Sequence, residues 1–389
     1  MTFRTRVHLT RLAPAWCLAA LLVGGCSALS VTPTSPLPGE WRTEGGGPER
    51  HHSTATTVAP PLAQQWSTDI DAAPASGGAV VVGDVLLIPT RKGDLLALDA
   101  LTGARRGRAG LAGPVSGTPV VVGDMVIVAT VAGRRTVTGR DLRSGRLRWG
   151  KELGAVEASP LRMADHVIIA GLDGRIHSLA LSDGASRWEA SGDDGSYFAA
   201  PLAIADSLVV TASDRGTVIA RRAASGDEVW RADVEAPVYS SPALSGALVL
   251  IPTTRGTLIA LDAATGQPRW RLQAASDLVR FSTPAVGEDL VIVAGTDGLL
   301  RALDFSGRET WSLLAPAGIA AAPLLAAGVV YAGTMNGRLL AVGAASGALL
   351  WTAPLPGRLV AAPIPVGERL VFLTHPRHAT AFSAVPDVR

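Results

Sequence analysis

Short apolar runs separated by turn residues fill the chain from Leu62 onward. Runs rich in β-branched residues occur at 85–88, 125–128, 167–169, 208–210 and 290–293. Runs of this length, bounded by glycine, proline and aspartate, are typical of buried strands. The apolar spacing of an amphipathic helix is not sustained anywhere in 62–389. The pattern therefore predicts an all-β fold.

These runs belong to a repeat whose most complete copy, at 260–270, reads Ala-Leu-Asp-Ala-Ala-Thr-Gly-Gln-Pro-Arg-Trp. The tryptophan follows the glycine by four residues, and successive tryptophans from Trp149 to Trp351 are 39, 42, 40, 41 and 40 residues apart. A fixed period of this size indicates an array or a propeller. The tryptophans of the repeat are Trp66, Trp149, Trp188, Trp230, Trp270, Trp311 and Trp351.

Each unit carries signals for four short strands. A proline usually opens the first strand, and a hairpin pair whose second residue is glycine joins the second strand to the third. These pairs are Lys92-Gly93, Asp173-Gly174, Arg215-Gly216, Arg255-Gly256, Asp297-Gly298 and Asn336-Gly337. Because glycine accepts positive φ, they predict type I′ turns. The aspartate of the third strand is expected to cap the Thr-Gly turn that follows. Four antiparallel strands in about 40 residues form one propeller blade.

Counting the units predicts eight blades. Trp66 lies 83 residues before Trp149, which is two periods, and the missing tryptophan between them falls at Gly107. The last unit begins at Pro363 and stops short of its own tryptophan position. The strand around Trp66 can complete that unit, which closes the ring and leaves no free sheet edge. The alternative, an open β-solenoid, would not need complementary ends.

The first 60 residues differ from the repeat. Arg4, Arg6 and Arg11 precede an apolar run at 12–23 that is too short for a stable membrane anchor, which is the layout of a secretory signal. The sequence Val-Gly-Gly-Cys ending at Cys26 resembles a bacterial lipobox, so Cys26 is expected to be acylated; an ordinary signal peptide is the alternative. Residues 26–60, rich in Pro, Ser, Thr and Gly, are expected to form a flexible tether. We therefore predict a signal peptide at 1–25, a tether at 26–60 and a propeller at 61–389.

Composition and charge narrow the function classes. From Cys26 onward the chain has 32 basic and 33 acidic residues and no second cysteine. A nearly neutral chain without a Lys/Arg run argues against a nucleic-acid partner. A single thiol cannot form an intramolecular disulfide, so packing must supply the stability of the fold.

The best candidate for a binding site lies just before the first strand of each unit. Pairs of small residues precede the prolines, at Gly117-Thr118, Ala158-Ser159, Ala199-Ala200, Ser240-Ser241, Ser282-Thr283, Ala321-Ala322 and Ala361-Ala362. First strands line the channel of a propeller, so small residues there satisfy packing, and a channel open to a ligand is the functional alternative. Larger residues lie slightly earlier, on loops expected to surround one mouth of the channel. This candidate interaction mouth comprises Glu157, Tyr197, Phe198, Tyr239, Arg280, Phe281 and Arg358. Alternatively, its aromatic residues plug the channel.

Signals for catalysis or metal binding are weak. His166 and His177 lie in or beside predicted strands, and His375 and His378 occupy the last hairpin without a Cys or acidic neighbour to complete a metal site. Asp193-Asp194-Gly195 lacks the spaced ligands of a calcium loop. We therefore expect no catalytic residue, no cofactor and no metal.

The Ala-x-Asp-x-x-Thr-Gly-x-x-x-Trp element at 260–270 resembles the tryptophan-docking repeat of quinoprotein dehydrogenases and other PQQ-like β-propeller proteins. The opening Glu40-Trp41, Gly45-Gly46-Gly47 and Arg50-His51-His52 is similar to the start of such proteins. The resemblance covers roughly 40–389. It implies an eight-bladed propeller with Trp66 in the closing strand.

Two branches of these proteins have different functions. The dehydrogenases hold pyrroloquinoline quinone (PQQ) with a disulfide between adjacent cysteines, a stacking tryptophan and calcium, and this propeller contains no cysteine. The other branch is the BamB-like outer-membrane-protein assembly lipoproteins. Cys26 followed by Ser27 fits that branch, which implies a non-catalytic scaffold at the periplasmic face of the outer membrane, with a BamA-type barrel-insertion protein as partner. A PQQ-dependent dehydrogenase and a ligand- or polysaccharide-binding propeller remain the alternatives.

Overall fold

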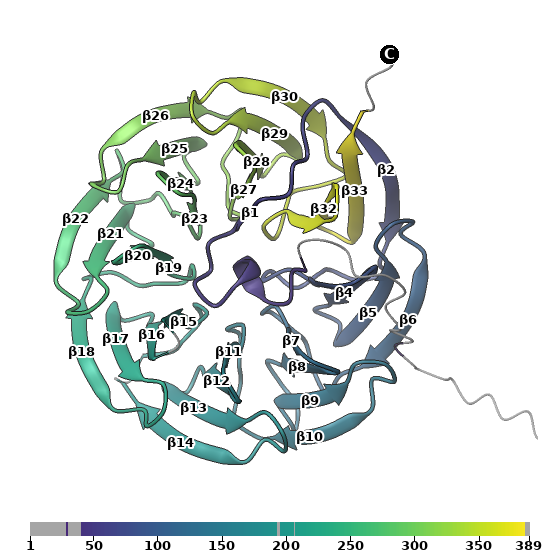
Figure 1. Cartoon of the computed structure of the whole chain (residues 1–389), viewed down its shortest axis with the longest axis vertical. Coiled ribbons are helices and arrows are strands. Elements are labelled where there is room, and N and C mark those ends of the chain that lie inside the picture. Colours follow the sequence, from purple (N-terminus) through teal and green to yellow (C-terminus); the bar gives the residue numbers. More distant parts are fainter. Residues whose placement is uncertain (1–28, 30–39, 193–194, 206, 386–389) are drawn as a thin grey trace, which may run out of the picture.

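The computed structural model describes residues 29, 40–192, 195–205 and 207–385, and places eight antiparallel sheets around a central axis (Figure 1). Within these residues the single helical element is the 3-10 turn η1 (Glu44–Gly46). No helix in the described part of the chain has the length and hydropathy to span a bilayer. The predicted all-β, eight-bladed architecture is confirmed.

Each blade runs from an inner strand at the channel to an outer strand at the rim. The first four blades consist of β3 (Val80–Val82), β4 (Val85–Pro89), β5 (Asp94–Asp99) and β6 (Arg105–Gly110); β7 (Val120–Val122), β8 (Met125–Ala129), β9 (Val137–Asp141) and β10 (Leu147–Lys151); β11 (Leu161–Met163), β12 (His166–Ala170), β13 (Arg175–Ala180) and β14 (Ser186–Ser191); β15 (Leu202–Ile204), β16 (Leu208–Ala212), β17 (Thr217–Arg222) and β18 (Glu228–Asp233).

The remaining blades consist of β19 (Ala243–Ser245), β20 (Leu248–Pro252), β21 (Thr257–Asp262) and β22 (Pro268–Gln273); β23 (Ala285–Val286), β24 (Val291–Ala294), β25 (Leu299–Leu303) and β26 (Glu309–Leu314); β27 (Leu324–Ala326), β28 (Val329–Gly333), β29 (Arg338–Gly343) and β30 (Leu349–Pro354); β31 (Ile364–Val366), β32 (Arg369–Thr374), β33 (His378–Ala384) and β2 (Leu62–Asp69). A short strand, β1 (Ser53–Thr54), adds to the seventh blade in parallel with β27. We number the blades 1 to 8 in this order.

The ring closes where the sequence predicts. Strand β2 pairs antiparallel with β33, and Trp66 faces Ala381 across the pair. A register shift between Gln64 and Trp66 repeats the irregularity before the tryptophans of other blades, such as the one opposite Ala260 and Leu261. Blade 8 therefore joins the two ends of the propeller, and its outer edge is formed by the N-terminal strand (Figure 1).

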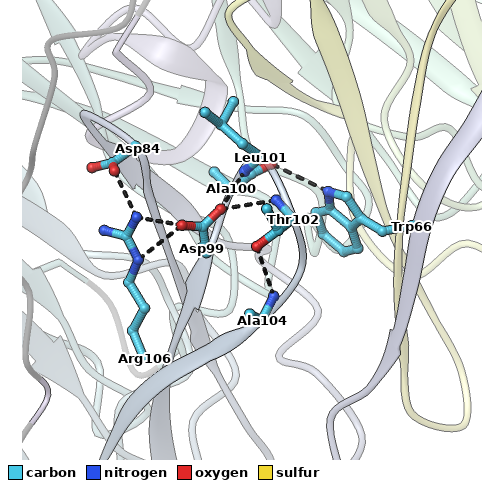
Figure 2. Close-up of polar contacts among 8 residues, drawn as sticks. All are labelled: Trp66, Asp84, Asp99, Ala100, Leu101, Thr102, Ala104 and Arg106. Atoms are coloured by element: carbon cyan, nitrogen blue, oxygen red, sulfur yellow. Dashed lines mark hydrogen bonds and ion pairs between the residues drawn. The ribbon is translucent and has the colours of Figure 1, made fainter.

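The repeat tryptophans dock each blade on the next. The ring of Trp66 lies on Gly103, where an added Cβ would meet it at 2.6 Å, and its Nε1 donates a hydrogen bond to the carbonyl of Ala100 at 3.3 Å (Figure 2). Equivalent bonds join Trp149, Trp188, Trp230, Trp270 and Trp311 to the carbonyls of Leu181, Ala223, Ala263, Phe305 and Ala344. Trp351 instead meets the ring of Phe382 edge-on, with 6.1 Å between centroids. Apart from Trp351, each tryptophan thus packs on the glycine in the turn between the third and fourth strands of the next blade, where a larger residue would clash with the indole.

The aspartate of the repeat caps its turn, as expected. Figure 2 shows Asp99 accepting hydrogen bonds from the amides of Leu101 and Thr102, while its second oxygen pairs with Arg106. In the most complete copy, the Arg269 guanidinium and the Thr265 hydroxyl lower the pKa of Asp262 to about 2. The turn is therefore held by an ionised carboxylate over most of the pH range.

The prediction of type I′ hairpins between the second and third strands is wrong. Gly93 has a φ of 91°, but none of the residues before the hairpin glycines has positive φ. The amide of Gly93 donates to the carbonyl of Thr90, and the amide of Thr90 donates to that of Asp94. This is a type I turn followed by a glycine in the left-handed region, which requires positive φ at one residue rather than two.

Leu29 lies in the docking position left by the missing tryptophan. It is fully buried against Ala109 and Leu142 in the core that joins blades 1 and 2. Its side chain reaches Gly145, where a Cβ would meet it at 3.2 Å, and Gly145 corresponds to the glycines that the tryptophans cover elsewhere. Leu29, from outside the repeat, thus takes the place of the indole that a tryptophan at position 107 would provide.

We expect Leu29→Ala to lower the free energy of unfolding by about 2–4 kcal/mol, because it leaves a cavity between two blades. Gly107→Trp should recover most of this loss, since the indole would fill the same position. Chemical denaturation of the two single variants and the double variant measures the coupling. Additive effects would show that Leu29 and residue 107 do not share a site.

The prediction of a flexible tether needs correction for residues 40–60. Trp41 and Val58 are buried, and the hydroxyl of Tyr331 donates a hydrogen bond to the carbonyl of Val58. Composition rich in proline and glycine did not prevent packing here, because the backbone finds partners on the blades. The signal peptide, Cys26 and the rest of the tether, Leu29 excepted, lie outside the described residues.

Candidate functional site

The segment 41–54, which we call the plug, crosses the axis of the ring at one end of the channel (Figure 1). Its carbonyls accept hydrogen bonds from amides of the inner strands of blades 1, 2, 4, 5, 6 and 7. The acceptors are Trp41, Arg42, Pro48, Glu49, His51, His52 and Thr54, and their donors are Val81, Val121, Ala203, Leu244, Val286, Leu325 and Ala327. The plug therefore ties most of the ring together through its backbone.

A buried ion pair lies inside the plug. The Arg50 side chain is fully buried, donates from Nε to the carbonyl of Pro201 at 2.8 Å, and lies 3.6 Å from the Glu44 carboxylate. Glu44 also accepts a hydrogen bond from the Ser241 hydroxyl at 2.7 Å. Burial opposes ionisation of Glu44, but Arg50 and neighbouring hydroxyls outweigh it and lower the pKa of this carboxyl. The plug thus holds a charged carboxylate at the axis.

Glycines allow the plug to turn in this confined space. Gly45 and Gly46 have φ values of 70° and 82°, and a Cβ on Gly46 would lie 2.6 Å from the Trp41 ring. Only glycine adopts this conformation without strain. Gly45 and Gly46 are therefore structural requirements of the plug, whereas Gly47 has an extended backbone.

His52 faces the channel from the plug. Its imidazole is buried, lies edge-on to Trp41 with 6.4 Å between ring centroids, and neither ring nitrogen has a hydrogen-bond partner among the described residues. Desolvation lowers the pKa of His52 to about 4, against the attraction of Glu44. The imidazole is therefore neutral at physiological pH.

We expect the protein to lose stability as pH falls from about 6.5 to about 4. In this window His52 binds a proton in the unfolded state but not in the folded state. Its contribution to the free energy of unfolding therefore falls by about 3 kcal/mol between the two pH values. Glu44, Arg50 and His51 are the charged or titratable groups that act on it. Chemical denaturation at several pH values should show that the free energy of unfolding declines less in His52→Gln than in the unchanged protein. The exposed His375→Gln serves as control, and an equal decline in all three proteins would contradict the assignment.

The channel between the plug and the opposite mouth contains a cavity of about 510 Å³. Its walls are the small residues predicted to line the channel, and they are hydrogen-bonded from blade to blade. Ser159 Oγ accepts from the amide of Thr118 at 2.7 Å, and Ser241 Oγ accepts from that of Ala200 at 3.2 Å. At Gly117 a Cβ would meet the backbone of Ser159 at 2.7 Å. Close approach of the inner strands thus explains the small residues.

The seven residues of the predicted interaction mouth do not form one cluster. Glu157, Phe198 and Tyr239 line the cavity, with the rings of Phe198 and Tyr239 edge-on at 5.1 Å between centroids. Tyr197 and Phe281 are instead buried in blade cores, and the Arg301 guanidinium lies over the Phe281 ring. Arg280 and Arg358 are exposed and lie outside the cavity lining.

The histidines discussed as catalytic or metal candidates take structural positions. His166 Nε2 contacts the carbonyl of Ala223 at 3.2 Å, and His177 lies 3.4 Å from Glu189. In the described residues no group of three His, Cys, Asp or Glu side chains could hold a metal ion. Asp193 and Asp194 lie outside the described residues.

Sequence reasoning missed the contributions of Glu44, Arg50 and His52 to the channel. Their signal was present as charged and aromatic residues interspersed with three glycines at 41–52, which is unusual for a solvated linker. No neighbouring repeat provides a copy of this segment, so its position could not be read by analogy.

Comparison with known proteins places this fold in a family. A family model described as outer membrane protein assembly factor BamB matches residues 52–197, 172–318 and 296–385. No curated protein sequence matches the chain. Among solved structures, BamB from Moraxella catarrhalis is similar, with 20% identity, a TM-score of 0.68, and coverage of 83% of this chain and 99% of that one.

Two other solved structures share the fold at low sequence identity. The computationally designed protein Ika8 shares 17% identity, with a TM-score of 0.71 and coverage of 81% of this chain and 97% of its own. A quinohemoprotein alcohol dehydrogenase from Pseudomonas putida shares 12% identity, with a TM-score of 0.77 and coverage of 93% of this chain and 84% of its own. At these identities the structures establish the fold alone, whereas the family model spans nearly the whole propeller. The chain therefore belongs to the BamB family of PQQ-like β-propeller proteins.

Proposed function

We propose that this protein is a non-catalytic, lipid-anchored scaffold of the cell envelope that binds a BamA-type barrel-insertion protein and assists outer-membrane protein assembly. The observation that carries the proposal is the family match along the propeller, combined with exposed apolar side chains on loops at the mouth end. Cys26, as the expected lipid attachment site, would hold the propeller at the periplasmic face of the outer membrane.

Three neighbouring blades each carry one of these exposed apolar side chains. Tyr239 in the loop entering blade 5, Leu278 in the loop entering blade 6 and Met335 in a hairpin of blade 7 are 47%, 83% and 45% exposed. The amide of Met335 donates to the carbonyl of Gly318 in the loop entering blade 7, so this hairpin is at the mouth end. Large apolar side chains on loops of a rigid scaffold are typical of protein-binding surfaces. We call Tyr239, Leu278 and Met335 the mouth patch.

A PQQ-dependent dehydrogenase is the competing function, because quinoprotein dehydrogenases share the fold. The described residues of this channel do not fit the cofactor: PQQ bears several carboxylates, whereas those that line the cavity include Glu44 and Glu157 and no lysine or arginine. Incubation with PQQ and calcium should therefore give neither bound quinone absorbance nor dye-linked alcohol or sugar oxidation. Either signal would favour the enzyme.

Affinity purification from envelope extracts tests the scaffold function. The mature protein should enrich a BamA-type barrel protein, and the triple variant Tyr239→Ser, Leu278→Ser and Met335→Ser should lose it. A matched control replaces Leu314 and Leu350 with serine, since both are similarly exposed on outer strands. If no barrel protein is enriched, or if the control loses it equally, the proposed partner surface is wrong.

A further inference from the structure

We infer that the channel binds a small organic cation carrying a primary ammonium group, between the plug and the aromatic pair at the mouth. This inference goes beyond the scaffold function and does not depend on it. The binding region is the cavity described above, which is closed by the plug at one end.

Chain direction shows that the cavity has one open end. In blade 4, Phe198 lies at the mouth, Ala200 lines the wall, and the amide of Ala203 binds the plug; in blade 5, Tyr239, Ser241 and Leu244 follow the same order. A ligand would therefore enter past Tyr239 and Phe198 and meet the plug. A volume of about 510 Å³ is within the range of small-molecule sites.

The charges of the lining favour a cation. Among the described residues that line the cavity, Glu157 near the mouth and Glu44 on the plug are the acidic side chains, and none is a lysine or an arginine. Arg50 lies outside the lining and extends from the plug to blade 4, where it donates to the carbonyl of Pro201. Arg50 neutralises Glu44, so with His52 neutral Glu157 is the lining carboxylate to which an ammonium ion would be drawn. A carboxylate in a narrow, low-dielectric channel raises the local concentration of cations.

Unused hydrogen-bonding groups point to a ligand with polar hydrogens. His52 lines the cavity and is only 3% exposed. Neither of its ring nitrogens has a hydrogen-bond partner among the described residues. The buried hydroxyl of Ser116, which also lines the cavity, has no partner in the described part of the chain. Buried polar groups without partners are uncommon in native proteins. A neutral imidazole and a hydroxyl can both accept hydrogen bonds from an ammonium group.

The aromatic pair suits the same ligand. The edge-on arrangement of Phe198 and Tyr239 leaves Tyr239 half exposed beside the entrance. Aromatic faces attract ammonium ions through their quadrupole. Glu157, the neutral imidazole and the aromatic rings thus favour a cation over an anion of the same size.

Three four-carbon probes of equal length test the inference: 1,4-diaminobutane, 1,4-butanediol and succinate. Calorimetry and thermal unfolding of the purified protein should show saturable binding of the diamine, with at least tenfold weaker binding of the diol and none of succinate. Glu157→Gln and Tyr239→Ala should each weaken diamine binding several-fold. The control Glu235→Gln, a more exposed carboxylate outside the lining, should leave it unchanged.

Several outcomes would overturn the inference. Absence of diamine binding at millimolar concentration would remove the site, and equal binding of diol and diamine would remove the requirement for charge. Equal loss in Glu157→Gln and Glu235→Gln would indicate nonspecific attraction to the surface. Because no partner protein is present in these measurements, their failure would leave the scaffold function untouched.

Discussion

Replacement of Arg50 by methionine is expected to lower the free energy of unfolding by about 3–5 kcal/mol. The guanidinium is fully buried, donates to the carbonyls of Pro201 and Glu44, and lies 3.6 Å from the Glu44 carboxylate. Methionine fills part of the volume but leaves the carboxylate charged and buried without its cation. Chemical denaturation measures the loss, and proteolysis within 40–60 should become faster because the plug keeps only the backbone bond between Pro48 and Ala203 as its link to blade 4.

The double variant Glu44→Gln, Arg50→Met separates charge from packing. It should be more stable than Arg50→Met alone, because removing both charges avoids an uncompensated buried ion. If the double variant is instead less stable by the sum of the two single effects, the ion pair does not control the stability of the plug.

Replacement of Trp66 by alanine is expected to cost about 3–5 kcal/mol, because it leaves a cavity between blades 8 and 1. The indole covers Gly103 and donates to the carbonyl of Ala100 (Figure 2), and it belongs to the strand that closes the ring. The loss should therefore include weaker pairing of β2 with β33. Hydrogen exchange should accelerate first in these two strands.

Leu278→Ala provides the matched control for this variant, since it also removes a large apolar side chain but from an exposed position. Leu278→Ala should change the free energy of unfolding by no more than about 0.5 kcal/mol. A similar loss in both variants, or faster exchange spread evenly over all blades, would argue against a specific closing role for Trp66.

The fold was predictable because its determinants recur. The spacing of the tryptophans, the capping aspartates and the hairpin glycines each appear in several copies, so a weak copy such as the one at Gly107 could be placed by its neighbours. The hairpin type was mispredicted because a glycine in second position is compatible with more than one turn, and only the φ of the preceding residue distinguishes them.

The site was less predictable because its determinants occur once. The plug binds the blades through carbonyls, which leave no side-chain pattern in the sequence. At the mouth, neighbouring residues point in opposite directions: Phe198 lines the cavity while Tyr197 is buried, and Arg280 is exposed while Phe281 is buried. Position in the repeat identifies the loop, but a shift of one residue reverses which side chain reaches the channel.

Site-specific photo-crosslinking tests the proposed scaffold function most directly. A benzophenone amino acid at position 239, in the mouth patch, should crosslink a BamA-type barrel protein in intact envelopes. The same group at position 350, on the outer strand β30, should not. Crosslinking at 350 but not at 239, or crosslinks from 239 to other proteins only, would contradict the account.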